Sequence, residues 1–298
     1  MIVRSWLFVP GDSERKQTKA LASAADALIL DLEDSVALAR RDQARAQVAG
    51  VLRARRPRLA QRLWVRLNSL ESGALLDDLA AVMPGAPDGI VLPKVSSIDE
   101  VIEVHHYLSA LEQREGLAGQ STRVLVIATE TARAVLRLAQ FAEAAACPPR
   151  LAALTWGAED LSAALGAREK LTADGALVPT FQLARSLCLL AAAAAGVQAV
   201  DGIHADFTDR PGLLRELEQA RRDGFSGKLA IHPDQIEPIN TAFTPTESEL
   251  AVARRIVAAF AASPDIGVTS IDGRMVDRPH LLRAQRLLAA AEHLARQS

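Results

Sequence analysis

Three carboxylates lie where apolar runs of the sequence end. Glu130 closes the run at 124–130, and Glu159 with Asp160 follows the run at 151–157. Acidic side chains at the carboxyl ends of parallel strands lie where α/β enzymes place their chemistry. The alternative is that the acidic pair only stabilises a helix N-terminus, which is worth about 0.3–1 kcal/mol. Because Glu130 lies one strand–helix unit upstream of the pair, we favour a shared chemical site.

The elements that must position these carboxylates recur along the chain. Short apolar runs alternate with helical patterns, and the runs span residues 5–10, 27–31, 63–68, 89–94, 124–130, 151–157, 197–203 and 228–232. Alternating helices and continuously apolar strands predict a parallel sheet. Eight such units in about 235 residues predict a closed (β/α)8 TIM barrel. A doubly wound open sheet is the alternative, but no Gly-x-Gly-x-x-Gly motif follows the first strand.

The barrel prediction implies that polar residues gather at one end, because this fold keeps its active site at the carboxyl ends of the strands. Nearly every predicted strand does end in a charged or amide residue. These residues are Asp12, Asp31 with Glu33 and Asp34, Arg66 with Asn68, Lys94, Glu130, Glu159 with Asp160, Asp201 and His232. Some of them are expected to be ordinary helix caps, which favour Asp and Asn.

Composition narrows the class of protein. The 298 residues, 49% of them hydrophobic, suffice for one large α/β domain with or without an appendage. The formal charge of −2 argues against nucleic acid or an anionic membrane as the main partner. Cys147 and Cys188 form no Cys-x-x-Cys pair, so we expect neither zinc nor a disulfide framework. The longest apolar run, at 187–197, is about half a membrane span, and we expect a cytoplasmic protein without a signal peptide.

The end of the chain lies outside the eight units. We therefore expect a catalytic barrel domain over residues 1–238 and a C-terminal helical extension over 239–298. Thr246 begins a capping-box pattern that predicts a helix; a strand-like segment, a turn over 272–279 and a last helix over 281–296 follow. The extension either covers one end of the barrel or acts as a lid over its mouth. A Gly-containing turn with two Asp and two Arg favours the lid.

Nine motifs, in chain order, resemble those of the citrate lyase β-subunit-like family, which includes malyl-CoA and citramalyl-CoA lyases. They are RSWLFVPGD (4–12), DLEDSV (31–36), VRLN (65–68), VLPKV (91–95), ETA (130–132), WGAEDL (156–161), DGI (201–203), GF-x-GK-x-AIHP-x-QI (224–236) and DGRMVDRP (272–279). The resemblance implies a TIM barrel, a Mg²⁺ ion that Mn²⁺ can replace, and homo-oligomers that are commonly trimers. It also implies reversible C–C cleavage of a 3-hydroxyacyl-CoA into acetyl-CoA and a 2-oxo acid.

The resemblance assigns roles to individual residues. Glu130 and Asp160 match the family's metal ligands, which agrees with the preference of Mg²⁺ for hard oxygen ligands. Arg66 matches the substrate arginine, whose planar fork suits a carboxylate. Asp277 matches the aspartate of the lid, the expected base. Glu159 is expected to line the substrate site; the donors that stabilise the thioester enolate stay open, with backbone N–H groups near Glu159 as candidates.

Two further groups of residues complete the predicted site. Asp31, Glu33 and Asp34 are expected to hold Arg66 and metal-bound water without binding the metal themselves. Arg15, Lys16 and Lys19 are candidates for binding the phosphates and adenine of CoA, with a solvated helix face as the alternative.

The sequence leaves three functions open. The first is a stand-alone Mg²⁺-dependent lyase that forms glyoxylate or pyruvate from malyl-CoA or citramalyl-CoA. The second is the β subunit of citrate lyase, which acts on the citryl thioester of an acyl-carrier protein to give oxaloacetate. The third is a non-catalytic barrel that binds CoA or a protein. The lid residue Asp277 favours the first. The presence of Glu130, Asp160 and Arg66 together with Asp277 argues against the third.

Overall fold

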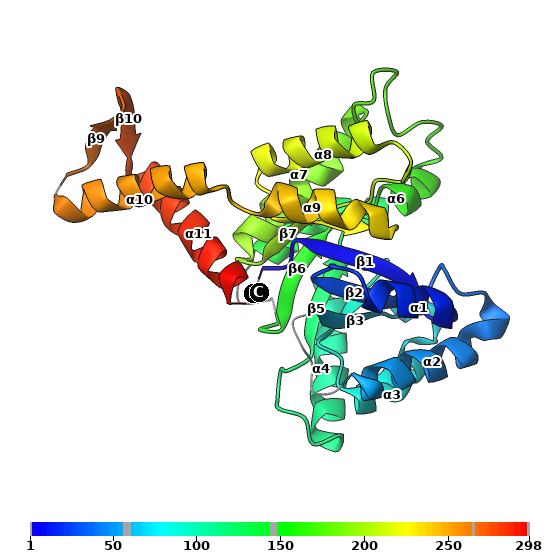
Figure 1. Cartoon of the computed structure of the whole chain (residues 1–298). Helices are drawn as coiled ribbons and strands as arrows, with labels where there is room; N and C mark the ends of the chain where they lie inside the picture. The colour runs from blue at the N-terminus through cyan, green and yellow to red at the C-terminus, as the bar shows by residue number, and fades with distance from the viewer. Residues whose placement is uncertain (1, 56–60, 144–147, 264–265, 297–298) are drawn as a thin grey trace. The chain divides into compact units, whose positions relative to one another are not determined.

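A computed structural model describes residues 2–55, 61–143, 148–263 and 266–296 (Figure 1). The chain forms two compact units, Val3–Asn240 and Thr241–Ser298 with Met1–Ile2. The first unit is a closed barrel of eight parallel strands in the order β1 to β8, so the TIM-barrel prediction is confirmed. Cys147 lies outside the described residues, and Cys188 is a buried free thiol. Among the described helices, none is long and apolar enough to cross a membrane.

Each barrel strand is short and mostly buried. The strands are β1 (Ser5–Pro10), β2 (Ala27–Asp31), β3 (Arg62–Arg66), β4 (Gly89–Leu92), β5 (Arg123–Ile127), β6 (Leu151–Thr155), β7 (Gln198–Asp201) and β8 (Gly227–Ala230). Parallel strands that are covered on both faces have near-continuous apolar sequences, which explains why all eight were predicted. Several strands end earlier than predicted, because polar residues such as Lys94 and Glu130, which close their apolar runs, belong to the loops.

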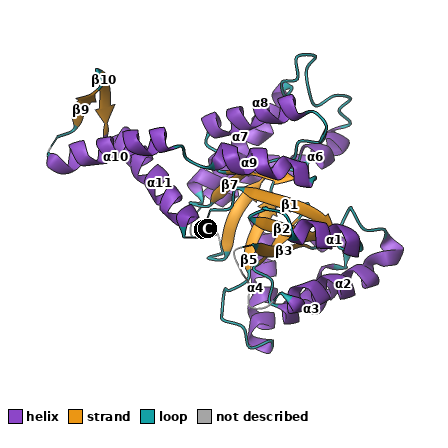
Figure 2. Cartoon of the chain, viewed as in Figure 1, coloured by secondary structure: helices purple, strands orange, loops and turns teal. Residues whose placement is uncertain are grey.

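Helices surround the barrel strands in the first unit (Figure 2). They are α1 (Glu14–Leu21), α2 (Arg41–Ala54), α3 (Leu75–Val82), α4 (Ile98–Arg114), α5 (Ala132–Arg137), α6 (Ala158–Leu165), α7 (Pro179–Ala194), α8 (Arg210–Asp223) and α9 (Ile236–Phe243), whose last residues belong to the second unit. Short 3-10 turns lie at Leu38–Arg40, Leu70–Ser72, Met83–Gly85, Leu138–Ala142 and Pro233–Gln235. This alternation of strand and helix leaves the loops after the strands to form the site.

Two tryptophans fill the barrel interior. Trp6 and Trp64 are buried and meet edge to face, with ring centroids 4.9 Å apart. A Cβ atom at Gly89 would lie 2.3 Å from the Trp64 ring, so only glycine fits there. Each buried aromatic side chain removes roughly 150–250 Å² from water, which makes this pair a large part of the core.

A buried ion pair lies at the amino-terminal end of the barrel. The Arg150 side chain is fully buried and donates to both oxygens of Glu112, at 2.9 and 3.0 Å. It also donates to the Thr122 carbonyl, to Ser109 Oγ and to His105 Nδ1. Burial alone would raise the pKa of Glu112, but the hydrogen bonds from Arg150 and two backbone N–H groups hold it below its ordinary value.

The second unit contains α10 (Glu247–Ala262), β9 (Val268–Ile271), β10 (Arg274–Asp277) and α11 (Arg278–Ala295). The capping box predicted at Thr246 is present at the start of α10. The predicted turn over 272–279 is wrong in extent. Only Asp272 and Gly273 form the turn, both at positive φ, and β10 then pairs antiparallel with β9. An Asp-Gly pair favours such a tight hairpin turn.

Candidate active site

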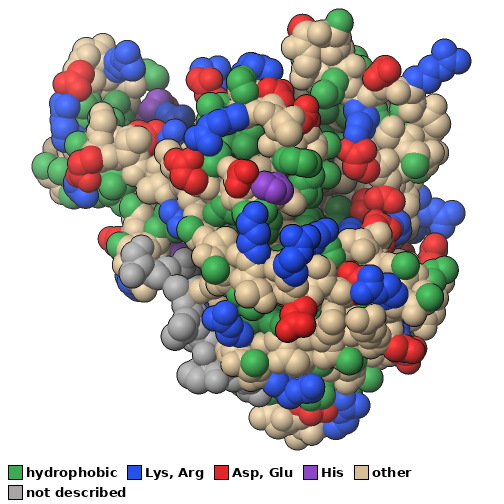
Figure 3. Space-filling view, turned by 45° about the vertical axis from the view of Figure 1, so that its right-hand side comes forward, with side chains coloured by type: hydrophobic (Ala, Val, Ile, Leu, Met, Phe, Trp, Pro, Cys, Tyr) green, Lys and Arg blue, Asp and Glu red, His purple; other side chains and the backbone are tan. Residues whose placement is uncertain are grey.

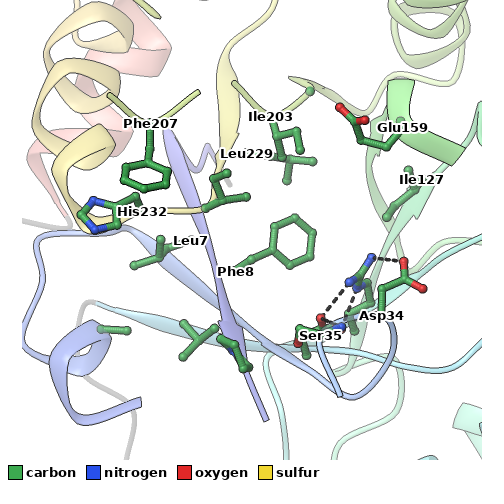
Figure 4. A pocket seen from close by; sticks show the side chains of 18 of the residues that line it. Leu7, Phe8, Asp34, Ser35, Ile127, Glu159, Ile203, Phe207, Leu229 and His232 are labelled. Carbon is green, nitrogen blue, oxygen red and sulfur yellow. Dashed lines mark hydrogen bonds and ion pairs between the residues drawn. The ribbon is translucent and has the colours of Figure 1, made fainter. Parts of the chain in front are cut away.

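A cavity of about 730 Å³ opens at the carboxyl ends of the barrel strands (Figure 4). Its volume falls within the roughly 300–1,000 Å³ that is typical of small-molecule sites. Phe8, Ile203 and Leu229 form an apolar side, and Phe207 stacks on His232 with ring centroids 4.9 Å apart. In Figure 4, Phe207 and His232 lie on the side away from Glu159 and Asp34, and Phe8 lies between the two sides. The cavity therefore combines an apolar wall with a charged one.

Arg66 lies on the charged side, at the end of β3. Its Nε and Nη2 donate to the two oxygens of Asp31, each at 2.7 Å, and Nη1 lies 2.9 Å from Glu33 Oε2. Its guanidinium also lies over the Phe8 ring, 4.8 Å from the centroid. Asp31 thus uses the bidentate face of Arg66, which is formed by Nε and one hydrogen of Nη2. Nη1 pairs with Glu33, and the second hydrogen of Nη2 points to another partner. Burial alone would raise the pKa of Asp31, but Arg66 outweighs it and the pKa is lowered.

Glu130 is a deeply buried carboxylate of the cavity wall, with 3% of its surface exposed. It accepts a hydrogen bond from the backbone N–H of Lys94. Burial raises the pKa of Glu130 to about 8, and the nearby Asp160 and Glu33 charges add to the rise. A Cβ atom at position 157 would lie 2.9 Å from Glu130 Cγ, so Gly157 makes room for the carboxylate. A buried carboxylate whose negative charge is neutralised by so few neighbouring groups favours a bound proton or a cation beside it.

Glu159 and Asp160 occupy the first turn of α6, and both line the cavity. Glu159 forms an ion pair with Lys170, whereas Asp160 Oδ1 lies 3.4 Å from Lys94 Nζ. Asp160 thus belongs to the same charged cluster as Glu130, and Glu159 is held by a basic residue of its own.

Lys94 connects the carboxylates of different loops, and the sequence marked it only as a polar strand end. Its Nζ lies 2.5 Å from Glu33 Oε1 and 3.2 Å from Asp34 Oδ1. Its backbone is left-handed, with φ of 54°. The available sequence signal was a lysine directly after the apolar run VLP, but neither its backbone conformation nor its partners could be predicted locally.

A hard divalent cation fits the donors of this wall. Mg²⁺ is usually held by one or two carboxylates, with water and substrate completing its shell. Glu130 and Asp160 both line the cavity, and the nearby Asp160 charge contributes to the raised pKa of Glu130. The described residues contain no group of three or more His, Cys, Asp or Glu side chains arranged around one point. The donor set therefore suits Mg²⁺ better than a metal that needs a complete protein cage.

Basic side chains lie at the edge of the cavity. Arg15, Lys16 and Lys19, all on α1, are exposed and line it. Figure 3 shows Lys and Arg side chains along the edge of a hollow with hydrophobic side chains on its floor. The structure thus brings the three predicted basic residues to the same opening.

Five of the polar strand-end residues do not line the cavity. Two of them, Glu33 and Lys94, pair with each other beside the lining residue Asp34. The expectation that such residues gather there is wrong for the other three. Asp12 pairs with Arg40, and the Asn68 amide donates to Asp78. Asp201 is buried and accepts from Trp156 Nε1 at 2.7 Å and from Arg185 at 2.9 Å. Such contacts position the loops instead of binding a ligand.

Asp277 belongs to the second unit, where it precedes α11 as its N-cap. The prediction placed it on a turn, but it ends β10 and forms a capping box with His280. His280 Nδ1 lies 2.5 Å from Asp277 Oδ1, and this hydrogen bond lowers the pKa of Asp277. Pro279 lies in the first turn of α11, where its fixed φ suits a helix start.

The fold and the cavity together define a TIM-barrel enzyme whose acidic site lies at the carboxyl ends of the strands. Residues 4–233 match the family model described as HpcH/HpaI aldolase/citrate lyase. The chain belongs to this family, and it is an enzyme of the carbon–carbon lyase type. The family resemblance stated from the motifs is therefore confirmed.

Named relatives and solved structures match almost the whole chain. Citrate lyase subunit beta of Escherichia coli (strain K12) is 36% identical over 97% of this chain and 93% of that protein. A (3S)-malyl-CoA thioesterase of Cereibacter sphaeroides (strain ATCC 17029) is 36% identical over 98% of this chain and 95% of that protein. The crystal structure of Mycobacterium tuberculosis CitE with magnesium, acetoacetate and coenzyme A aligns with a TM-score of 0.77, 36% identity and 98% coverage of both chains.

Proposed function

We propose that this protein is a Mg²⁺-dependent lyase that reversibly cleaves a 3-hydroxyacyl-CoA, such as malyl-CoA or citramalyl-CoA. The products are acetyl-CoA and a 2-oxo acid, glyoxylate or pyruvate. The observation that carries the proposal is Glu130, a buried carboxylate with a pKa raised to about 8 beside Asp160 in a cavity of ligand size. The M. tuberculosis structure with magnesium, acetoacetate and coenzyme A supports the choice of magnesium and of a CoA substrate.

Glu130 and Asp160 are the residues that would hold the ion. When bound, Mg²⁺ supplies Lewis acidity toward the carbonyl of the 2-oxo acid, and Mn²⁺ can replace it. Asp31 fixes Arg66, and Nη1 of Arg66 pairs with Glu33 and Asp34. We propose that the second N–H of Nη2 contacts the substrate carboxylate. Because Asp31 uses the bidentate face, we propose that substrate meets Arg66 from the cavity side only. Glu159 lines the same wall and is proposed to contact substrate.

The thioester is proposed to enter along the basic edge. Arg15, Lys16 and Lys19 offer positive charge for the phosphates of CoA. The apolar wall around Phe8 and Leu229 excludes water from the acyl end, which strengthens electrostatic interactions in the site.

The base is proposed to be Asp277. It would take a proton from the substrate hydroxyl during cleavage, or from the acetyl methyl during condensation. The hydrogen bond with His280 lowers the pKa of Asp277, so the carboxylate is ionised and able to accept a proton at neutral pH. We further propose a homo-oligomer, with a trimer as the expected form, that works in the cytoplasm with small-molecule partners.

The names of two kinds of relative favour alternative functions, and one experiment distinguishes these functions from the proposed one. The E. coli relative is named citrate lyase subunit beta, and the C. sphaeroides relatives are named (3S)-malyl-CoA thioesterase. Purified protein would be incubated with malyl-CoA, citramalyl-CoA and citryl thioesters of CoA and of an acyl-carrier protein, with products identified by mass spectrometry. We expect acetyl-CoA and glyoxylate or pyruvate. Free CoA with malate would indicate a thioesterase, and turnover of the carrier-bound citryl thioester alone would indicate a citrate lyase subunit.

A further inference from the structure

The acidic side of the cavity carries more negative than positive charge. Four carboxylates of this side line the cavity, and Glu33 lies beside them, paired with Lys94. We call these five residues the acidic cluster: Asp31, Glu33, Asp34, Glu130 and Asp160. In the described part of the chain, the ion pairs of these carboxylates are made with Arg66 and Lys94. Arg66 is committed to the loop after β2, whereas Lys94 reaches the loops after β2 and β6. Lys94 is therefore the cation that joins separate parts of the cluster.

Lys94 touches both proposed metal ligands, each with a different group. Its backbone N–H donates to Glu130 Oε2, and its Nζ lies 3.4 Å from Asp160 Oδ1. The left-handed backbone, with φ of 54°, is an uncommon conformation for a residue with a side chain. A residue at this strained position directs its N–H to one ligand while its side chain extends to the other.

We infer that Lys94 is a positioning residue that acts as a built-in counter-ion for the acidic cluster. Its ammonium competes with the divalent cation for Asp160, so it stabilises the metal-free cluster and weakens metal binding. This inference rests on the proposed function, because it takes Glu130 and Asp160 as the ligands of the ion.

The sign of the effect follows from electrostatics and linkage. An ammonium a few ångströms from a divalent cation repels it, and the repulsion is large in a partly buried site. A group that stabilises the metal-free state more than the metal-bound state must lower metal affinity by the same factor. If Lys94 only arranged the ligands for the ion, its removal would weaken metal binding instead.

The test measures Mg²⁺ binding to the full-length chain by isothermal titration calorimetry, with wild-type protein and Lys94→Met. Methionine keeps the apolar stem and removes the charge. We expect the Kd for Mg²⁺ to fall about tenfold, which corresponds to about 1.4 kcal/mol. Thermal unfolding in chelator should start from a lower midpoint in Lys94→Met, and Mg²⁺ should raise that midpoint more than in wild type. Lys94→Arg keeps the charge and should bind Mg²⁺ within about twofold of wild type.

The matched control is Lys170→Met. Lys170 pairs with Glu159, the neighbour of Asp160 on the same helix turn, so the substitution removes an equal charge next to the other carboxylate. Its Kd for Mg²⁺ should stay within about twofold of wild type. A second variant, Lys94→Gln, keeps a polar group for Glu33 and should show the same tightening if Lys94→Met fails to fold.

The outcomes separate this inference from the proposed function. Tighter binding in both Lys94→Met and Lys94→Gln, with Lys170→Met unchanged, supports a competing counter-ion. Unchanged or weaker binding in the Lys94 variants, with normal binding in wild type, overturns the inference alone. Wild-type protein that binds no Mg²⁺ overturns the proposed metal site and the inference with it. An equal gain in Mg²⁺ affinity in Lys170→Met would also overturn the inference, because the loss of any nearby positive charge would then have the same effect.

Discussion

The two ends of the barrel differ in how completely their buried carboxylates are neutralised by basic groups. At the amino-terminal end, one arginine meets one glutamate, and Arg150 also donates to Ser109, His105 and a carbonyl. At the carboxyl end, the acidic cluster contains more carboxylates than basic groups, and the pKa of Glu130 is raised to about 8. The pKa of Glu112, by contrast, is lowered.

The charges at the amino-terminal end stabilise the fold, whereas those at the carboxyl end are available to bind a ligand. A fully satisfied polar network makes a core rigid and specific. A strongly perturbed carboxyl group in a cavity is typical of a functional site. In TIM barrels the amino-terminal end serves stability and the carboxyl end serves chemistry, and the Arg150–Glu112 pair and the acidic cluster fit this division.

The largest expected effect comes from emptying the proposed metal site. Glu130→Ala, Asp160→Ala or excess chelator should reduce turnover of malyl-CoA to background, because the carboxylates that would hold the ion, or the ion itself, are lost. Added Mg²⁺ or Mn²⁺ should restore the chelated enzyme. Steady-state kinetics and calorimetry with the 2-oxo acid would measure this, with the exposed Asp174→Ala as control. Full activity in excess chelator would refute the metal assignment.

A second test asks whether the carboxyl end of the barrel suffices for chemistry. Asp277→Asn keeps the shape of the side chain and removes the proposed base, so kcat should fall about 10²–10⁴-fold. Calorimetric binding of Mg²⁺ and acetyl-CoA should be unchanged. Mixing this variant with Glu130→Ala subunits, after dissociation and reassembly, should restore activity if Asp277 serves a neighbouring subunit. An Asp277→Asn enzyme with normal kcat would show that the base lies elsewhere.

The amino-terminal end should respond in stability alone. Glu112→Gln leaves the Arg150 charge buried without its partner, and breaking such a pair typically costs about 3–5 kcal/mol. Urea denaturation would measure the loss in the free energy of unfolding. The Kd for Mg²⁺ of the folded variant should match wild type. A loss below about 1 kcal/mol would mean that this end is not the stabilising one.

In the metal-free protein, the free energy of unfolding should depend on pH because of Glu130. Its folded pKa of about 8 exceeds the ordinary value of about 4.3, so between these values the folded state binds the extra proton. The free energy of unfolding should therefore fall as pH rises through this window, by up to about 5 kcal/mol. Glu130→Gln should remove this part of the slope, as measured by denaturation in chelator. Saturating Mg²⁺ should flatten it too, because the ion favours the ionised carboxylate.

The smallest expected effect concerns Arg66. Arg66→Lys keeps the charge but loses the planar fork, so affinity for glyoxylate or pyruvate should fall by about 1.5–3 kcal/mol, the worth of a charged hydrogen bond. Affinity for acetyl-CoA should be unchanged in the same calorimetric series. Arg45→Lys is the matched control, because Arg45 pairs with Asp78 outside the cavity. Equal losses for both ligands would contradict the assigned role.

The sequence alone was enough to predict the barrel and the strand-end positions of its main carboxylates. Parallel strands buried on both faces are continuous apolar runs, so their order and number are local features. Glu130 closes one of these runs and Asp160 comes shortly after another, and the fold places such residues at one end. The capping box at Thr246 was readable for the same reason, because its two members lie three residues apart.

Only the tertiary structure decided which charges meet. Arg66 bonds Asp31 across 35 positions of the sequence, and Lys94 bonds Glu33 across 61. Asp201, a strand-end residue like the others, joins Trp156 and Arg185 in the interior instead of facing the cavity. Local periodicity determines which residues form a strand or a helix. Whether a carboxylate binds an arginine, a lysine or an ion depends on loops that come together only when the barrel closes.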